Sequence, residues 1–192
     1  TANLAPALTA TTRLSDLAGA RLQDVATGPV NVTVGGTTVS VDLSQASTAG
    51  DVTSILNAAL ATAGSDATVG LSGGGLVVNG DSTQSLTIAD TSGGTTAADL
   101  GIAGTVAAGG PLTSVSLGAK VTATTPLASL NNGAGIDPSG IIITNGSTSA
   151  TITLAGPPAL STVGDLLNAI NGSGTHITAS IDPSGETINL NN

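Results

Sequence analysis

The chain has 192 residues, a net charge of −9 from twelve acidic and three basic residues, and no Cys, Met, Trp, Tyr or Phe. Phosphate contacts need clustered Lys or Arg, so this charge balance argues against nucleic acid and against anionic lipid surfaces as partners. No stretch approaches the roughly 20 apolar residues that span a bilayer. Without cysteine there is no disulfide or thiol chemistry, and any core must be built from Val, Ile, Leu and Ala.

An internal repeat organises the chain. Residues 9–12 (TATT) return at 122–125, an offset of 122 − 9 = 113, and the TxGD pattern of residues 48–51 returns at 162–165, an offset of 162 − 48 = 114. Recurrence over this distance predicts duplicated folded modules. The second copy lacks a counterpart of residues 85–102, so we expect the chain to be a window on a longer array. The predicted divisions are 1–7, the tail of a preceding unit or a linker; 8–102, a first module; 103–120, a linker or exposed strand rich in Gly, Ala, Ser and Thr; and 121–192, a second, truncated module.

The first module begins with a predicted β-hairpin. Residues 30–34 and 38–43 alternate apolar and polar side chains around Gly35-Gly36, a turn that accepts positive φ. Ser47 or Thr48 is then placed to cap a helix whose apolar residues recur at 3.6-residue spacing until Gly64. Further strands are predicted at residues 67–71, 76–79 and 85–89.

The second module follows the same plan. The sequence predicts a hairpin from residues 141–143 and 150–154 around Asn145-Gly146, a helix from Ser161 or Thr162 to Asn171-Gly172, and strands near 177–181 and 187–190. The strings at 137–140 and 182–185 are both Asp-Pro-Ser-Gly, which is typical of a type I turn. The predicted fold class is α+β: two tandem modules, each a small antiparallel sheet covered by one amphipathic helix.

Several of these strings resemble the flagellin hook IN motif of flagellins and flagellar hook-associated proteins. They are the hairpin, TAGDV at 48–52 with ILN at 55–57, and TVGDL at 162–166 with AIN at 169–171. Residues 95–102 and 127–136 are similar to segments that flank such repeats. The resemblance covers most of residues 9–190. It implies a surface-exposed insertion of an exported flagellar protein, although the long terminal helices that polymerise in that family are absent from these 192 residues.

Catalytic chemistry finds little support in the sequence. His176 is the single histidine and is expected on the polar side of a strand, and no serine lies in a nucleophile-elbow context. Asp81, Asp90 and Asp99 are spread over loops, and Glu186 is the single glutamate. We expect these acids to form turns and caps; a calcium site from loop carboxylates is a weaker alternative without the required spacing.

Binding motifs are equally weak. The glycines at 70–75 precede no helix and no lysine, so a hairpin turn is predicted instead of a phosphate loop. Three strings match the N-glycosylation sequon, at Asn31, Asn145 and Asn171, as is common in a chain rich in Ser and Thr. The apolar helix faces either meet partners or, as we expect, pack on their own sheets; they comprise Val52, Ile55, Leu56, Ala59, Leu166, Leu167 and Ile170.

The sequence therefore predicts a non-enzymatic structural domain with no catalytic, cofactor-binding or metal-binding residue. The resemblance implies a bacterial flagellin-like or hook-associated protein that is secreted, serves cell motility at the flagellum or cell surface, and contacts copies of itself or other flagellar subunits. Nucleic acid, membrane and small-molecule substrates are not expected. The alternative is a repeat module of a bacterial surface adhesin or surface-layer protein, which would contact host or matrix through exposed turns.

Overall fold

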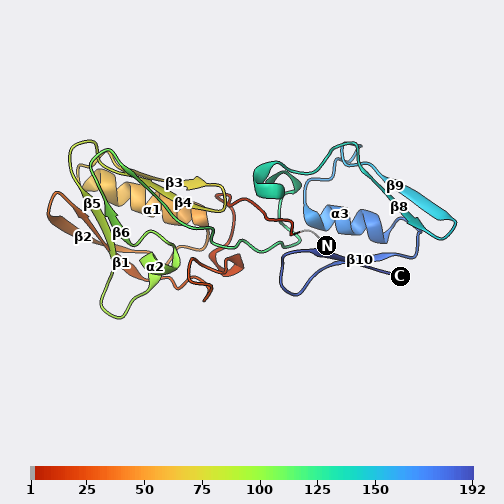
Figure 1. Cartoon of the computed structure of the whole chain (residues 1–192), viewed down its shortest axis with the longest axis horizontal. Helices are drawn as coiled ribbons and strands as arrows, with labels where there is room; N and C mark the ends of the chain where they lie inside the picture. Colours follow the sequence, from red (N-terminus) through yellow and green to blue (C-terminus); the bar gives the residue numbers. More distant parts are fainter. Residues whose placement is uncertain (1–2) are drawn as a thin grey trace. The chain divides into compact units, whose positions relative to one another are not determined.

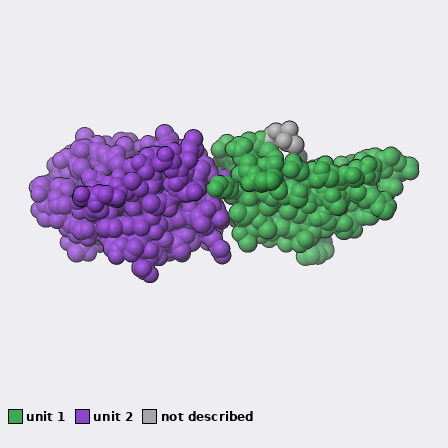
Figure 2. Space-filling model, turned by 90° about the horizontal axis from the view of Figure 1, so that it is seen from below, with its two compact units in different colours: residues 1–7, 120–192 green, residues 8–119 purple. Residues whose placement is uncertain are grey.

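The computed structural model describes residues 3–192, which combine α-helices with several small antiparallel sheets (Figure 1). The chain divides into two compact units, drawn in purple and green in Figure 2. The unit that comes first along the chain, called the first unit in the text, is Leu8–Ala119 (purple, labelled unit 2 in Figure 2). The second unit (green) is Lys120–Asn192 together with residues 3–7 of the N-terminal segment. Within the described residues, no helix is long and apolar enough to cross a membrane.

The first unit contains two sheets and two helices. One sheet has the order β2-β1-β5-β6 and the other β3-β4-β7, and all neighbours are antiparallel. The helix α1 (Ala49–Thr62) contacts β3 and β2, and the short α2 (Thr96–Asp99) contacts β5. The strands are β1 (Pro29–Val34), β2 (Thr37–Asp42), β3 (Thr68–Ser72), β4 (Gly75–Asn79), β5 (Leu86–Asp90), β6 (Gly104–Val106) and β7 (Pro111–Thr113).

The second unit contains two hairpins and one helix. Strand β8 (Ile141–Asn145) pairs with β9 (Thr148–Ile152), and β10 (Thr178–Ile181) pairs with β11 (Ile188–Asn191). Figure 1 shows α3 (Val163–Asn171) between the β8–β9 hairpin and β10. Three 3₁₀ turns complete the described part of the chain, one in the first unit at Leu14–Asp16 and two in the second at Leu127–Ser129 and Asn131–Gly133.

Each unit has its own aliphatic core. In the first unit, the inward residues of β1 (Val30, Val32 and Val34) belong to the same buried core as Leu56 and Leu60 of α1. In the second unit, Ile143 and Ile152 of the hairpin pack with Val163, Leu166 and Ile170 of α3. The predicted hairpins and long helices are therefore confirmed. Alternate residues of β1 and one stripe of each helix are buried, whereas β8 and β9 each bury a single residue, Ile143 and Ile152.

The predicted linker, residues 103–120, differs from the structure. It forms β6, which pairs with β5, and β7, which pairs with β4, and Val106 and Leu117 are buried in the first core. Strands of three residues are too short to show a clear alternation, and their partners are distant in sequence. Residues 3–7, predicted as the tail of a preceding unit or a linker, group with the second unit, while Thr1 and Ala2 lie outside the described residues.

Candidate functional site

The start of α1 is a closed network of backbone and side-chain hydrogen bonds. The Thr48 Oγ1 accepts the Asp51 N–H at 3.1 Å, and the Asp51 carboxylate accepts the Thr48 N–H at 2.9 Å, which is a capping box. The same Asp51 oxygen also accepts the N–H and the hydroxyl of Ser47, at 2.9 and 2.8 Å. These bonds, those from Ser47 first and those from Thr48 next, lower the pKa of Asp51 to about 2.

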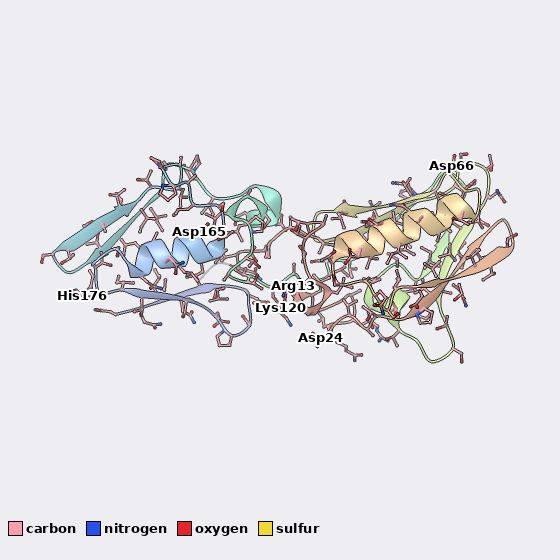
Figure 3. All side chains as sticks on the ribbon, turned by 180° about the vertical axis from the view of Figure 1, so that it is seen from behind. Arg13, Asp24, Asp66, Lys120, Asp165 and His176 are labelled. Atoms are coloured by element: carbon pink, nitrogen blue, oxygen red, sulfur yellow. The ribbon has the colours of Figure 1, made fainter. Side chains whose placement is uncertain are left out.

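The start of α3 repeats this network with different residues. Thr162 and Asp165 form the capping box at 3.2 and 3.0 Å, and Ser161 donates its N–H and its hydroxyl to Asp165, both at 3.1 Å. Hydrogen bonds from Ser161 and Thr162 lower the pKa of Asp165 as well. Figure 3 shows Asp165 at the first turn of the helix. Both aspartates therefore serve the helix ends and are not available as acid–base groups.

The TATT turn packs on each helix start. In the first unit, the Ala49 and Gly50 N–H groups donate to the carbonyls of Thr12 and Ala10, both at 2.9 Å. A Cβ on Gly50 would lie 2.6 Å from the Ala10 oxygen, so the glycine permits this approach.

In the second unit, the corresponding donors are Val163 and Gly164, and their acceptors are Thr125 and Ala123, at 2.9 and 2.8 Å. A Cβ on Gly164 would lie 2.8 Å from the Ala123 oxygen. The glycine of the TxGD pattern has the same steric role in both units.

An asparagine on each helix binds the backbone of the next strand. The Asn57 amide accepts the Val69 N–H at 2.7 Å and donates to the Val69 carbonyl at 2.9 Å. Asn171 does the same with Ala179, at 2.6 and 3.1 Å. These are the asparagines of the Leu-Asn and Ile-Asn pairs, and each fixes a helix to the strand that follows it. The repeat was visible in the sequence, but the strand partner was not.

The loop acids do not converge on a common site. Asp81 is buried, and hydrogen bonds from Ser65, Thr83 and Gln84 lower its pKa. Asp90 accepts the N–H groups of Ala97 and Ala98 at the start of α2.

Asp99 is buried and paired with Arg21 at 2.7 Å. Burial acts to raise the pKa of Asp99, but hydrogen bonds from Thr95, Arg21 and the Ala26 N–H together lower it. Each acid has its own set of donors. Asp81 and Asp90 fit the turn-and-cap interpretation in part, through the N–H groups of Thr83, Gln84, Ala97 and Ala98, whereas Asp99 differs because it binds Arg21 and the Ala26 N–H, 78 and 73 residues away. Within residues 3–192, no group of three or more His, Cys, Asp or Glu side chains is placed to hold a metal ion.

His176 and Glu186 are exposed and lie outside the strands that they precede. His176 has a positive φ of 60° and follows the end of α3, whereas Asp165 lies at the helix start (Figure 3). His176 was predicted on a strand face, but it lies in the loop before β10. The glycines at 73 and 74 form the β3–β4 turn, as predicted.

The residues of the remaining motifs take part in the hydrogen bonds, cores and turns of the fold. In the three glycosylation sequons, the Asn145 amide donates hydrogen bonds to Thr175 and Asn192, and the Asn171 amide donates to Ala179. Asn31 lies in β1, which is paired on both sides. The helix faces pack in the cores of their own units, where Ile55, Ala59 and Leu167 are partly buried. Both Asp-Pro-Ser-Gly strings form turns closed by a bond from the fourth N–H to the first carbonyl.

Two open depressions lie beside the helix starts. That of the first unit has a volume of about 650 Å³ and includes Arg13, Val25 and Thr48 in its lining. That of the second unit has a volume of about 330 Å³ and is lined mainly by apolar residues, among them Leu127, Ile136 and Leu160. Neither lining contains a carboxylate or a histidine, so neither assembles an acid–base pair.

The hairpin that follows each long helix receives two distant segments at its turn. The β3–β4 turn accepts the Leu8 N–H at Gly73 and the Leu117 N–H at Gly74, both at 2.8 Å. The β10–β11 turn accepts the Val121 N–H at Gly185, at 2.6 Å, and the Leu4 N–H at Glu186, at 2.9 Å.

Comparison with protein-family models, with curated proteins and with solved structures gives no significant match to this chain.

Proposed function

We propose that the chain is a non-enzymatic structural domain, the surface-exposed repeat region of a bacterial flagellin-like or hook-associated protein. In this proposal it consists of two tandem modules, each with antiparallel strands covered by one amphipathic helix. The observation that carries the proposal is the recurrence of one hydrogen-bond set, formed by the TATT turn, the capping box and the helix asparagine, at two places 113 to 114 residues apart. The polar and charged groups in this set maintain the fold.

The mechanism in this proposal is architectural. The modules project from a filament or junction outside the cell and present an acidic surface rich in hydroxyl groups. A charged fraction of 8% favours close lateral packing, because few charged side chains need to be desolvated at contacts. The partners are copies of the same protein or other flagellar subunits; nucleic acid, membranes and small-molecule substrates have no part in it.

Immunogold electron microscopy of the cells that make the protein tests this proposal. Antibodies raised against residues 1–192 are expected to label filaments or the hook–filament junction, and to lose the label in a strain without flagella. The reading frame around this segment is also expected to encode heptad-patterned helices at both ends. Label that remains on the cell envelope of the strain without flagella would instead support a surface adhesin or surface-layer protein.

A further inference from the structure

The N-terminal segment closes the second unit in the way that residues 116–119 close the first. The two segments match at an offset of 117 − 4 = 113, so Leu4 corresponds to Leu117 and Ala5 to Gly118. Both leucines donate their N–H to the turn of a hairpin, and the residues after them have positive φ, 35° at Ala5 and 59° at Gly118. Two segments with one pattern therefore occupy corresponding places in the two units.

The N-terminal segment is held by four backbone hydrogen bonds. Besides the bond from Leu4 to Glu186, the carbonyls of Leu4 and Ala5 accept the N–H groups of Asn131 and Asn132 at 2.8 and 2.7 Å. The Ala7 N–H donates to Ser129 at 2.7 Å. The Leu4 side chain packs against the second core, and Leu117 is fully buried in the first. The segment is thus a docked peptide with one apolar anchor.

The chain connects each docked segment directly to the other unit. Residues 116–119 lead directly into the second unit at Lys120, and residues 3–7 lead directly into the first unit at Leu8. Each unit is therefore closed by the segment that enters the other unit. A segment 3–7 that comes from another copy can meet the same backbone groups of the second unit, and the first unit of that copy continues from Leu8.

We propose that the second unit of one copy binds residues 3–7 of a second copy, so that chains associate head to tail. The contact is heterologous, because the donor segment and the acceptor surface are different parts of the molecule, and repetition of it extends an array. The inference uses the correspondence of the two units and does not depend on the flagellar assignment. A negative immunogold result would therefore not contradict the head-to-tail contact. Absence of the head-to-tail contact would not contradict the flagellar proposal.

The intramolecular contact competes with the exchange. A tethered segment has an effective concentration on the order of 1 mM, so isolated monomers in dilute solution keep their own segment. Exchange requires copies at a similar concentration, together with a step that releases the segment. Unfolding and refolding at about 1 mM meets both conditions.

The test is refolding of the full chain at about 1 mM and at about 1 µM, followed by chromatography with light scattering. We expect monomer at the low concentration and a ladder of dimers and larger species at the high concentration. Leu4→Asp places a charge at the apolar anchor and should reduce the ladder at least tenfold. Asn3→Asp introduces the same charge one residue away, at an exposed position, and should keep it.

A second measurement shows whether the second unit of the Leu4→Asp variant is still folded and able to bind the segment. A synthetic peptide of residues 1–8, added in excess to this variant, should shift the amide NMR signals of Asn131 and Glu186. The same peptide with Leu4→Asp should leave them unchanged. Monomeric wild-type chain after refolding at the high concentration, an undiminished ladder in Leu4→Asp, or no response to the wild-type peptide overturns the proposal.

Discussion

The two helix asparagines show how one amide stabilises a strand edge. Asn57 and Asn171 each satisfy both the N–H and the carbonyl of a single strand residue. Val69, the partner of Asn57, is buried, so solvent does not replace the lost bonds when the amide is removed. An unpaired buried polar group costs about 1–3 kcal/mol.

Asn57→Ala and Asn171→Ala are therefore expected to lower the free energy of unfolding by about 1–3 kcal/mol each, measured by urea denaturation followed by circular dichroism. Asn168→Ala is the matched control, because Asn168 is exposed on α3. It should be neutral or slightly stabilising, since alanine favours helix more than asparagine does. Equal losses in Asn168→Ala and Asn171→Ala would contradict the role of the amide in fixing the strand.

At the same scale, the sequence marks these asparagines without revealing their role. Leu56-Asn57 and Ile170-Asn171 recur after the two TxGD patterns, and this recurrence singles them out. Val69 and Ala179 are partners because the following strand turns back along the helix. That placement depends on loop geometry and core packing, so residue spacing alone does not reveal it.

At the scale of elements, the helix starts make stability depend on pH. Asp51 has a folded pKa of about 2, below its ordinary value of 3.8, so its contribution is complete above about pH 4. It is lost as the pH falls from about 4 through 2, because the unfolded chain then binds the proton more strongly than the folded chain does. Asp165 also has a lowered pKa and contributes in the same direction.

We therefore expect the urea midpoint to fall when the pH is lowered from about 5 to about 2. The Asp51→Asn variant should start lower at the higher pH and lose less over this interval, because its side chain does not titrate. Asp16→Asn, on the 3₁₀ turn at residues 14–16, is a comparison at an acid outside the capping boxes. An unchanged pH slope in Asp51→Asn would show that the capping carboxylate does not couple to unfolding.

Prediction of the elements succeeded where the pattern is local. The hairpins β1–β2 and β8–β9 and the helices α1 and α3 follow from alternation, 3.6-residue spacing and caps within a short window. The strands β6 and β7 lie where a linker or an exposed strand was predicted, and the helix α2 was missed. Each is three or four residues long. The two strands are stabilised by pairing with β5 and β4, and α2 by the Asp90 carboxylate at the end of β5. Segments of this length carry too little periodicity to be recognised.

At the scale of the whole molecule, the two cores share no buried residue. Leu56 belongs to the first core and Ile170 to the second, and truncation of a buried Leu or Ile to Ala costs about 2–5 kcal/mol. Leu56→Ala should therefore accelerate hydrogen exchange in the strands from β1 to β5, and Ile170→Ala should accelerate it in the strands from β8 to β11. Ser54→Ala, on the exposed side of α1, is the control. Equal acceleration of both sets by either variant would show that the cores unfold as one.

The position of the N-terminal segment also has a consequence for the order in which the molecule is completed. Leu4 and Glu186 are joined by a hydrogen bond across 186 − 4 = 182 residues. The first unit is a continuous stretch, and it can finish folding as soon as residue 119 has been synthesised. The second unit needs residues that precede this stretch as well as residues that follow it, so it cannot be completed until the β10–β11 hairpin has been made. During synthesis, residues 3–7 therefore lack their partners in the second unit until residue 186 has emerged.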